Sequence, residues 1–243
     1  MTAGLARARL QGMLRMTEQI GRRFPLAKEE PLRGPTVVID SDTGLVTVEV
    51  EIFVERPVEE VADAINPPNW DVGSSFFQTD GTFLIAPEQA RCLAEGRSDC
   101  GPLREVDPPT NDYDWSVLHE RFHAEDEYGL DSAFTNLLWV NPDWIRTPQG
   151  ARMYVVAYTL YAALDGRVGA VTGVTILRDD GELSAKELAA DRTRVRMRKR
   201  IRFESQWANV ATYLGFRAVR DDLDDQFRAT ATAHVTPPTG PAS

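Results

Sequence analysis

The feature that most constrains this chain is the stretch LVTVEVEIFV, from Leu45 to Val54, in which residue type alternates with a period of two. One face of this stretch collects Val46, Val48, Val50, Ile52 and Val54. The other face collects Thr47, Glu49, Glu51 and Phe53. This period is that of a β-strand with one side in the core and the other toward solvent. Thr193–Phe203 has the same period and is predicted to be another strand.

Strand signals also dominate between these two stretches. Val, Tyr, Thr and Leu are frequent in three segments, which are predicted to be strands: Ser132–Val140, Arg152–Leu164 and Val168–Leu177. Upstream, Pro57 is expected to open a short helix over Val58–Ile65. The following region, Asn66–Pro109, is rich in Gly, Pro and Asp and predicts an elaboration of the domain. We expect it to contain a short strand at Thr82–Ala86 and a short helix around Glu88–Ala94.

Both ends of the chain predict helices. Gly4–Phe24 has apolar residues at helical spacing and carries five arginines against one acid, so a basic amphipathic helix is expected. Such a helix commonly packs its apolar stripe against the domain or a partner chain, and the alternative is an anionic membrane. From Ser205 a long helix is predicted, which Gly215 could bend or split. Its expected apolar stripe is Trp207, Val210, Ala211, Leu214, Ala218 and Phe227.

This order of elements resembles the helix-grip fold of the START-like, or SRPBCC, superfamily. VTVEVEIFVERPVEEVADAINPPNW (Val46–Trp70) is similar to the opening strand and first helices of that family. RMRKRIRFESQWANVATYLGF (Arg196–Phe216) is similar to its closing strand and the long helix that follows. The resemblance covers Leu45–Phe227. It implies an α+β fold in which a curved antiparallel sheet wraps around a long C-terminal helix, with an apolar cavity between them.

On this basis we expect an N-terminal helix and connector at residues 1–35, a helix-grip domain at residues 36–232 with an elaborated region at 73–114, and a disordered tail at 233–243. Members of the superfamily bind lipids, sterols, polyketides or plant hormones, and some are cyclases, aromatases or hydrolases. The expected function is therefore the binding of a hydrophobic small molecule, lipid-like or polyketide-like. A fold does not specify a reaction, so the sequence leaves open whether any catalysis occurs.

The resemblance also implies ligand-binding residues on the elements that border the cavity. These are the aromatic residues Trp70, Phe76, Phe77, Tyr154, Tyr158, Trp207 and Tyr213. On the closing strand, the period of two turns Met197 and Lys199 to the same inner side. Lys199 is the one cation among these apolar neighbours, and it either extends to the rim or holds an acidic group of the ligand.

The opposite face of the closing strand carries a row of arginines: Arg194, Arg196, Arg198, Arg200 and Arg202. Such a row could follow the phosphates of a nucleic acid. The resemblance instead places this strand beside the opening strand, where the arginines would pair with Glu49, Glu51 and Glu55. Because the chain also has a net charge of −10, we expect a structural role for the row and no nucleic-acid partner.

The stretch HERFH, from His119 to His123, matches the HExxH pattern of zinc hydrolases. On a helix the two histidines lie about 6 Å apart along the axis and can share a zinc ion, with Glu120 as general base. On a strand they lie about 13 Å apart and cannot share an ion. The local residues fit both structures, so a zinc-dependent hydrolase is the alternative function, with a third ligand such as Glu125, Asp126 or Glu127. A chance match, with no metal and no cofactor, is the main interpretation.

The two cysteines, Cys92 and Cys100, form no CxxC motif. Two free thiols in a reducing cytoplasm are expected, with a local disulfide as the alternative. The sequence contains no apolar run long enough for a transmembrane helix. Its first residues also differ from a signal peptide, because arginines interrupt the apolar positions. A cytoplasmic protein is therefore predicted, and a homo-oligomer or a peripheral contact through the N-terminal helix is left open.

Overall fold

The computed structural model describes residues 2–66, 77–102, 116–125, 131–163 and 176–235. The elements along these residues are α1 (Thr2–Arg23), β1 (Leu32–Ile39), β2 (Val46–Val54), α2 (Val58–Ala64), β3 (Phe77–Ile85), α3 (Pro87–Ala94), β4 (Ser116–Glu125), β5 (Asp131–Arg146), β6 (Arg152–Ala163), β7 (Ile176–Ala189), β8 (Arg192–Phe203) and α5 (Gln206–Ala233). Most of the predicted tail lies outside the described residues.

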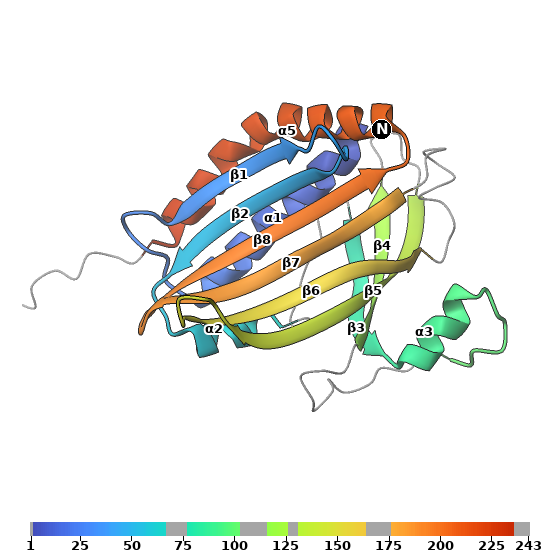
Figure 1. Ribbon diagram of the computed structural model, residues 1–243, viewed down its shortest axis with the longest axis horizontal. Coiled ribbons are helices and arrows are strands. Elements are labelled where there is room, and N and C mark those ends of the chain that lie inside the picture. Colours follow the sequence, from blue (N-terminus) through green and yellow to red (C-terminus); the bar gives the residue numbers. More distant parts are fainter. Residues whose placement is uncertain (1, 67–76, 103–115, 126–130, 164–175, 236–243) are drawn as a thin grey trace, which may run out of the picture.

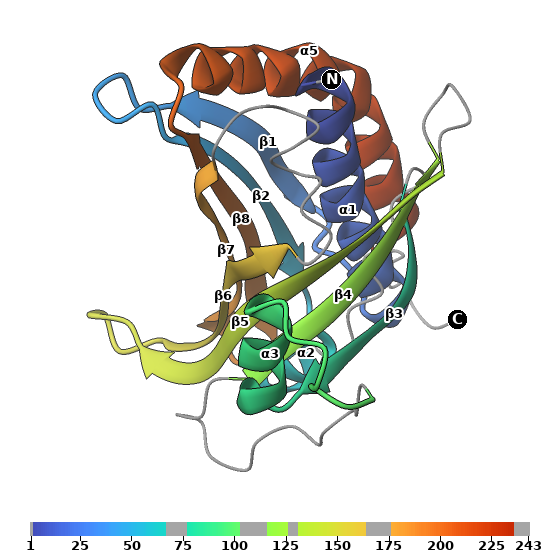
Figure 2. The same cartoon turned by 90° about the vertical axis from the view of Figure 1, so that its right-hand side faces the viewer.

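The eight strands form one antiparallel sheet in the order β1-β2-β8-β7-β6-β5-β4-β3 (Figure 1). The sheet is strongly curved, and β3 and β4 swing around toward the side on which the two long helices lie (Figure 2). The opening strand β2 lies beside the closing strand β8, with Val50 opposite Met197. This neighbour relation confirms what the resemblance to the helix-grip fold implies.

The long C-terminal helix α5 packs mainly on β1 and in addition on β8 and β2, and α1 lies along α5 (Figure 2). One hydrophobic core joins the sheet to both helices, and it includes Ile52, Phe216 and Phe227. Gly215 does not split α5, which is a single helix of 28 residues. A curved antiparallel sheet closed by a long C-terminal helix is the helix-grip architecture, so the predicted α+β class is confirmed.

The N-terminal helix α1 packs against the domain through its apolar stripe, as the more common alternative predicts. Leu10 and Ile20 are almost fully buried. At the C-terminal end of α1, the backbone N–H of Leu26 donates to the carbonyl of His234 at 2.9 Å, and a Cβ on Gly21 would lie 2.8 Å from the His234 ring. This stripe is therefore not available to a membrane surface. Among the described helices, none combines the length and the apolar character that crossing a membrane requires.

Two strands differ most from the prediction, while β3 begins earlier than expected and β5 ends later. β1 begins at Leu32, inside the segment expected to be a connector. β7 continues to Ala189 through residues for which no strand was expected. Its sequence, ILRDDGELSAKELA, is rich in charged and small residues, which are not typical of strands, but it is held by hydrogen bonds to β6 on one side and β8 on the other. The predicted strand Val168–Leu177 lies almost entirely outside the described residues.

The arginine row of β8 lies on the outer face of the sheet and pairs with acids on both neighbouring strands. Toward β2, Arg194 lies 3.0 Å from Glu51 and Arg198 lies 2.8 Å from Glu49, which confirms two of the three predicted partners. The third, Glu55, makes no ion pair with the described arginines of this row. Toward β7, the further partners are Glu182 for Arg196 and Asp180 for Arg200. We call this set of paired side chains the arginine ladder.

Acidification is expected to weaken the arginine ladder. Burial by itself raises the pKa of Glu182, but the hydrogen bond and the charge of Arg196 outweigh it and hold this pKa below its ordinary value. The pKa of Asp180 is lowered in the same way, against the effect of burial, by Arg178 and Arg200. A carboxyl group with a lowered pKa binds fewer protons in the folded state than in the unfolded state. Its contribution is therefore complete above the unfolded pKa of about 4 and is lost as the pH falls through the folded value.

We expect the free energy of unfolding, measured with urea at about pH 7 and about pH 3, to fall less for Glu182→Gln than for the wild type. Glu95→Gln is the matched control, because Glu95 is exposed and lies outside the ladder. A fall as large in Glu182→Gln as in the wild type would show that Glu182 contributes nothing to the acid sensitivity.

Candidate functional site

The concave face of the sheet is lined by alternate residues of β2, β8, β7 and β6, which the strand register arranges in rows. One row consists of Val50, Met197, Leu183 and Val156, and all four are buried. The next row consists of Val48, Lys199, Gly181 and Tyr158. In this row Lys199 and Gly181 lie next to each other on neighbouring strands, where the preceding row has apolar side chains.

Lys199 is a charged residue of this face, and its ammonium group forms an ion pair with the carboxylate of Asp179 on β7. The Lys199 and Asp179 side chains are only 16% and 8% exposed. In the ladder between β7 and β8, Asp179 lies opposite Ile201 and thus on the same face. Removing two charges from water is costly, and a close opposite charge offsets that cost. The predicted inward position of Lys199 is confirmed, and the pair forms a polar but electrically neutral position beside the side-chain-free backbone of Gly181.

Tyr154 lies two rows from Lys199 and is held by a polar contact at the end of α2. Its hydroxyl donates to Oδ1 of Asn66 at 2.9 Å. Its ring centroid lies 5.1 Å from that of Trp144, and the guanidinium of Arg152 lies 4.8 Å from the Trp144 ring centre. Because this hydroxyl already bonds Asn66, its described role is to fasten α2 to β6.

The structure brings together three of the predicted ligand-binding residues, since Tyr154, Met197 and Lys199 share the concave face. Trp207 is a wrong prediction, because it is 75% exposed on the outer side of α5. The turns of α5 that follow direct Ala208, Thr212 and Phe216 inward instead. Tyr213 is half-buried at the border of the core, with the guanidinium of Arg217 lying 5.9 Å from its ring centre.

Four predicted residues cannot be placed as side chains. Trp70 and Phe76 lie outside the described residues. Phe77 and Tyr158 lie on β3 and β6, where the backbone alone is described. Their part in ligand binding stays a prediction.

The HERFH stretch lies in the middle of β4, and this overturns the zinc hydrolase alternative. His119 pairs with Leu137 and His123 with Ala133 in a regular ladder with β5. On a strand these two histidines are separated by about 13 Å, too far for one zinc ion at ordinary Zn–N distances. Glu125 closes the same strand, and Asp126 and Glu127 lie outside the described residues. The HExxH match is therefore a coincidence of strand residues.

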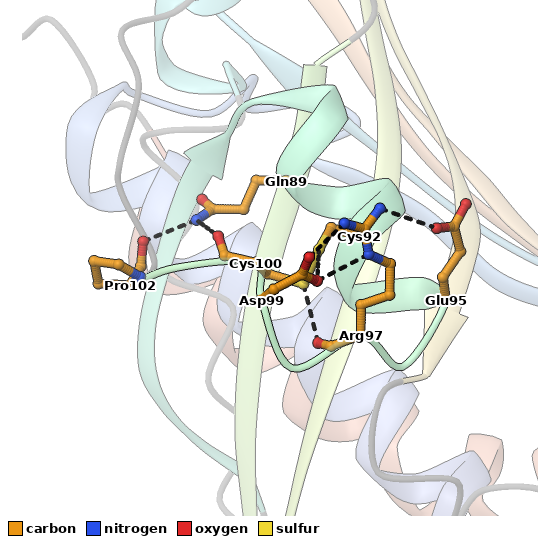
Figure 3. Close-up of a disulfide and its surroundings, with 7 residues drawn as sticks. All are labelled: Gln89, Cys92, Glu95, Arg97, Asp99, Cys100 and Pro102. Carbon is orange, nitrogen blue, oxygen red and sulfur yellow. Dashed lines mark hydrogen bonds and ion pairs between the residues drawn. A yellow bond between two sulfur atoms is a disulfide. The ribbon is translucent and has the colours of Figure 1, made fainter.

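The cysteines also differ from the expectation. Cys92 and Cys100 form a disulfide across the turn that follows α3 (Figure 3), so the expectation of two free thiols is wrong for this structure and the alternative is correct. Around the bond, Arg97 donates to both carboxylate oxygens of Asp99, at 2.9 and 2.7 Å. The Arg97–Asp99 ion pair and the disulfide therefore lie together in one short loop.

Sequence reasoning missed Asp179 and Trp144 on the concave face, and Asn66 after α2, which bonds to Tyr154 of that face. Asp179 and Asp180 are adjacent in sequence, and a period of two through this part of β7 would have sent them to opposite faces. That signal was not usable, because no strand was predicted there. Asn66 had no distinguishing signal, since its role depends on where α2 ends.

Comparison with known proteins gives neighbours in structure only. No family model and no curated protein match the chain. The Zhui aromatase/cyclase from Streptomyces sp. R1128 is 14% identical, with 78% of this chain and 93% of that chain covered and a TM-score of 0.35. A START superfamily protein from Mycobacterium smegmatis is 10% identical, with coverages of 75% and 97% and a TM-score of 0.34. The lipid transfer and protein localization domain of human StarD13 is 9% identical, with coverages of 83% and 90% and a TM-score of 0.38. All three scores are low, so the fold assignment rests on the strand order and packing described above.

Proposed function

We propose that this chain binds a hydrophobic small molecule, lipid-like or polyketide-like, against the concave face of its sheet. The polar end of the guest lies at the Lys199–Asp179 pair. The proposal is one of binding, and it assigns no reaction to the chain.

The observation that carries this proposal is the neutral ion pair set into an apolar wall beside Gly181. Buried ion pairs contribute little to stability compared with apolar side chains of the same volume, so stability alone gives little reason for a pair at this position. Ligand sites typically combine an apolar lining with a few polar groups that orient the guest. Lys199 offers hydrogen-bond donors and Asp179 offers acceptors, which together suit a hydroxyl or carbonyl group.

The zero net charge of the pair also favours an uncharged guest. A carboxylate or phosphate placed here would leave one buried negative charge in excess, and an excess buried charge is costly. This selection can be tested with two fluorescent probes that share a ring skeleton: neutral N-phenyl-naphthylamine and the anionic anilinonaphthalene sulfonate. We expect the neutral probe to bind more tightly.

The experiment combines native mass spectrometry of the freshly purified protein with titration of the two probes. We expect an organic mass that leaves on denaturation, or saturable binding of the neutral probe that such a guest displaces. Gly181→Ala should weaken probe binding, because the added methyl group occupies the bare position beside Lys199. Lys186→Ala, on the outer face of the same strand, is the matched control. A chain that carries no guest and binds neither probe, or a Gly181→Ala variant that binds like the wild type, would overturn the proposal.

We also propose the cytoplasm as the location of the chain, supported by its sparse use of cysteine. A reducing compartment implies that Cys92 and Cys100 spend time as thiols there. Alkylation of both thiols in intact cells would agree with this location, and a disulfide that resists alkylation would contradict it.

A further inference from the structure

The turn after α3 brings two sulfur atoms and a carboxylate into one small cluster. Cys92 lies on α3, and Cys100 follows the turn that carries Asp99 (Figure 3). The Sγ atoms of both cysteines and a carboxylate oxygen of Asp99 all lie within 4.8 Å of one another. Cys92 and Cys100 are half-buried and Asp99 is exposed, so the cluster is accessible to solutes. No part of the proposed binding function uses it.

In addition to the covalent disulfide, several hydrogen bonds hold this loop. The backbone N–H of Arg97 donates to the carbonyl of Cys92 at 3.2 Å, and that of Gly96 donates to the carbonyl of Leu93 at 3.0 Å. Gln89 on α3 reaches over the far side of the turn and donates to the carbonyl of Pro102 at 2.8 Å and to that of Cys100 at 3.4 Å. These bonds keep the two cysteines near each other when the covalent link between the sulfur atoms is opened.

Opening the disulfide changes the electrostatics of the loop. Its two sulfur atoms become thiols beside the carboxylate of Asp99, which accepts two hydrogen bonds from Arg97. Two thiolates and one carboxylate within such short distances repel one another. A bound divalent cation relieves this repulsion, while Arg97 can compensate only one of the charges.

We propose that the reduced form of this loop binds a thiophilic divalent cation such as Zn²⁺ through Sγ of Cys92, Sγ of Cys100 and the carboxylate of Asp99. Thiolate ligands select zinc-like ions over Mg²⁺ and Ca²⁺, which take oxygen ligands. Three protein ligands leave the fourth tetrahedral position open to water. The site is separate from the proposed guest site on the concave face, and neither depends on the other.

The conversion balances as a thiol–disulfide exchange followed by metal capture. A dithiol donates two electrons and two protons to the Cys92–Cys100 bond and is itself oxidised to a disulfide. The cation then displaces the two thiol protons, which are released to solvent. The same loop is therefore a disulfide under oxidising conditions and a metal site under reducing conditions.

The test is anaerobic titration of the full chain, after reduction with dithiothreitol and desalting, with Zn²⁺ and with Co²⁺ as a spectroscopic probe. We expect one tightly bound ion for each reduced chain and a thiolate-to-cobalt charge-transfer band. The oxidised chain should show no such band. The Cys92→Ser/Cys100→Ser double variant should lose both signals, and far-UV circular dichroism of each sample confirms that it is folded.

Asp99→Asn should weaken zinc binding by at least about tenfold. Glu95→Gln is the matched control, because Glu95 is an exposed carboxylate of the same loop outside the cluster. If the reduced wild type binds no more zinc than the double cysteine variant, the site does not exist. If Asp99→Asn binds zinc as tightly as Glu95→Gln, Asp99 is not a ligand and the proposed site is wrong in its composition.

Discussion

Replacing Lys199 by Met is expected to lower the free energy of unfolding by about 3–5 kcal/mol. The substitution removes the ammonium group and leaves the carboxylate of Asp179, which is 8% exposed, without its described ion-pair partner. An uncompensated buried charge is among the most destabilising changes that one substitution can make. Urea unfolding monitored by circular dichroism measures the change, and Arg202→Met on the outer face of the same strand provides the control.

The double variant Lys199→Met/Asp179→Leu separates stability from binding. Because it removes both charges and fills their volume with apolar groups, we expect it to recover to within about 1 kcal/mol of the wild type or to exceed it. If the pair orients a guest, this stable double variant should bind the neutral probe more weakly than the wild type does. A single-variant loss below about 1 kcal/mol would show that Asp179 is not dependent on Lys199 for compensation.

The second large effect is expected on α5. Phe227 is fully buried in the core, and Phe227→Ala should cost about 3–5 kcal/mol, because it removes a large apolar side chain and leaves a cavity. Trp207→Ala, on the same helix, should change stability by less than about 0.5 kcal/mol, since Trp207 is 75% exposed. Equal losses for the two variants in urea unfolding would mean that the helix presents a different face to the sheet from the one described.

This contrast between the faces of α5 also shows where sequence reasoning was limited. The predicted stripe combined Phe227, which is buried, with Trp207 and Leu214, which are exposed. In the first turns of α5, apolar residues occur on both sides, while the buried side carries polar Asn209. Asn209 is accommodated because its side chain bonds the N–H and the carbonyl of Phe203, at 2.6 and 3.1 Å. A buried amide whose partners lie on another element looks like a surface residue in the sequence.

The strands were predictable where their residues alternate and one face enters the core. β2 and β8 meet this condition, and the phase of β8 predicted the inward position of Lys199. The resemblance to the helix-grip fold, not the phases, placed the arginine row beside Glu49 and Glu51. β7 does not meet this condition, because its residues are mostly charged or small and have a weak preference for strands. It forms a strand because it hydrogen-bonds to a strand on each side. With β7 missing, Asp179 could not be found, so one half of the candidate site was predictable and the other half was not.

The HERFH stretch and the cysteines show a different limit. His119 and His123 share a face in either structure, and only hydrogen bonding to β3 and β5 decides that they lie on a strand. Cys92 and Cys100 are brought together by the turn after α3, and no residue pattern in the loop indicates this proximity. Metal binding by the histidines and disulfide formation by the cysteines both depend on how far apart the two side chains lie in the fold, and the sequence does not specify that distance.

The pairing of β2 with β8 has a consequence for how this chain is made. The ion pair between Glu49 and Arg198 joins residues that are 149 positions apart, so the contacts between β2 and β8 have a very high contact order. During synthesis β2 can form a hairpin with β1 early, but its other edge has no neighbour until nearly the whole chain has left the ribosome. α1 must wait even longer, because α5, the helix against which it docks, follows all the described strands in the sequence. Its basic, amphipathic surface is thus exposed until α5 has been synthesised, so a helix that precedes all the described strands is among the last elements to reach its native position.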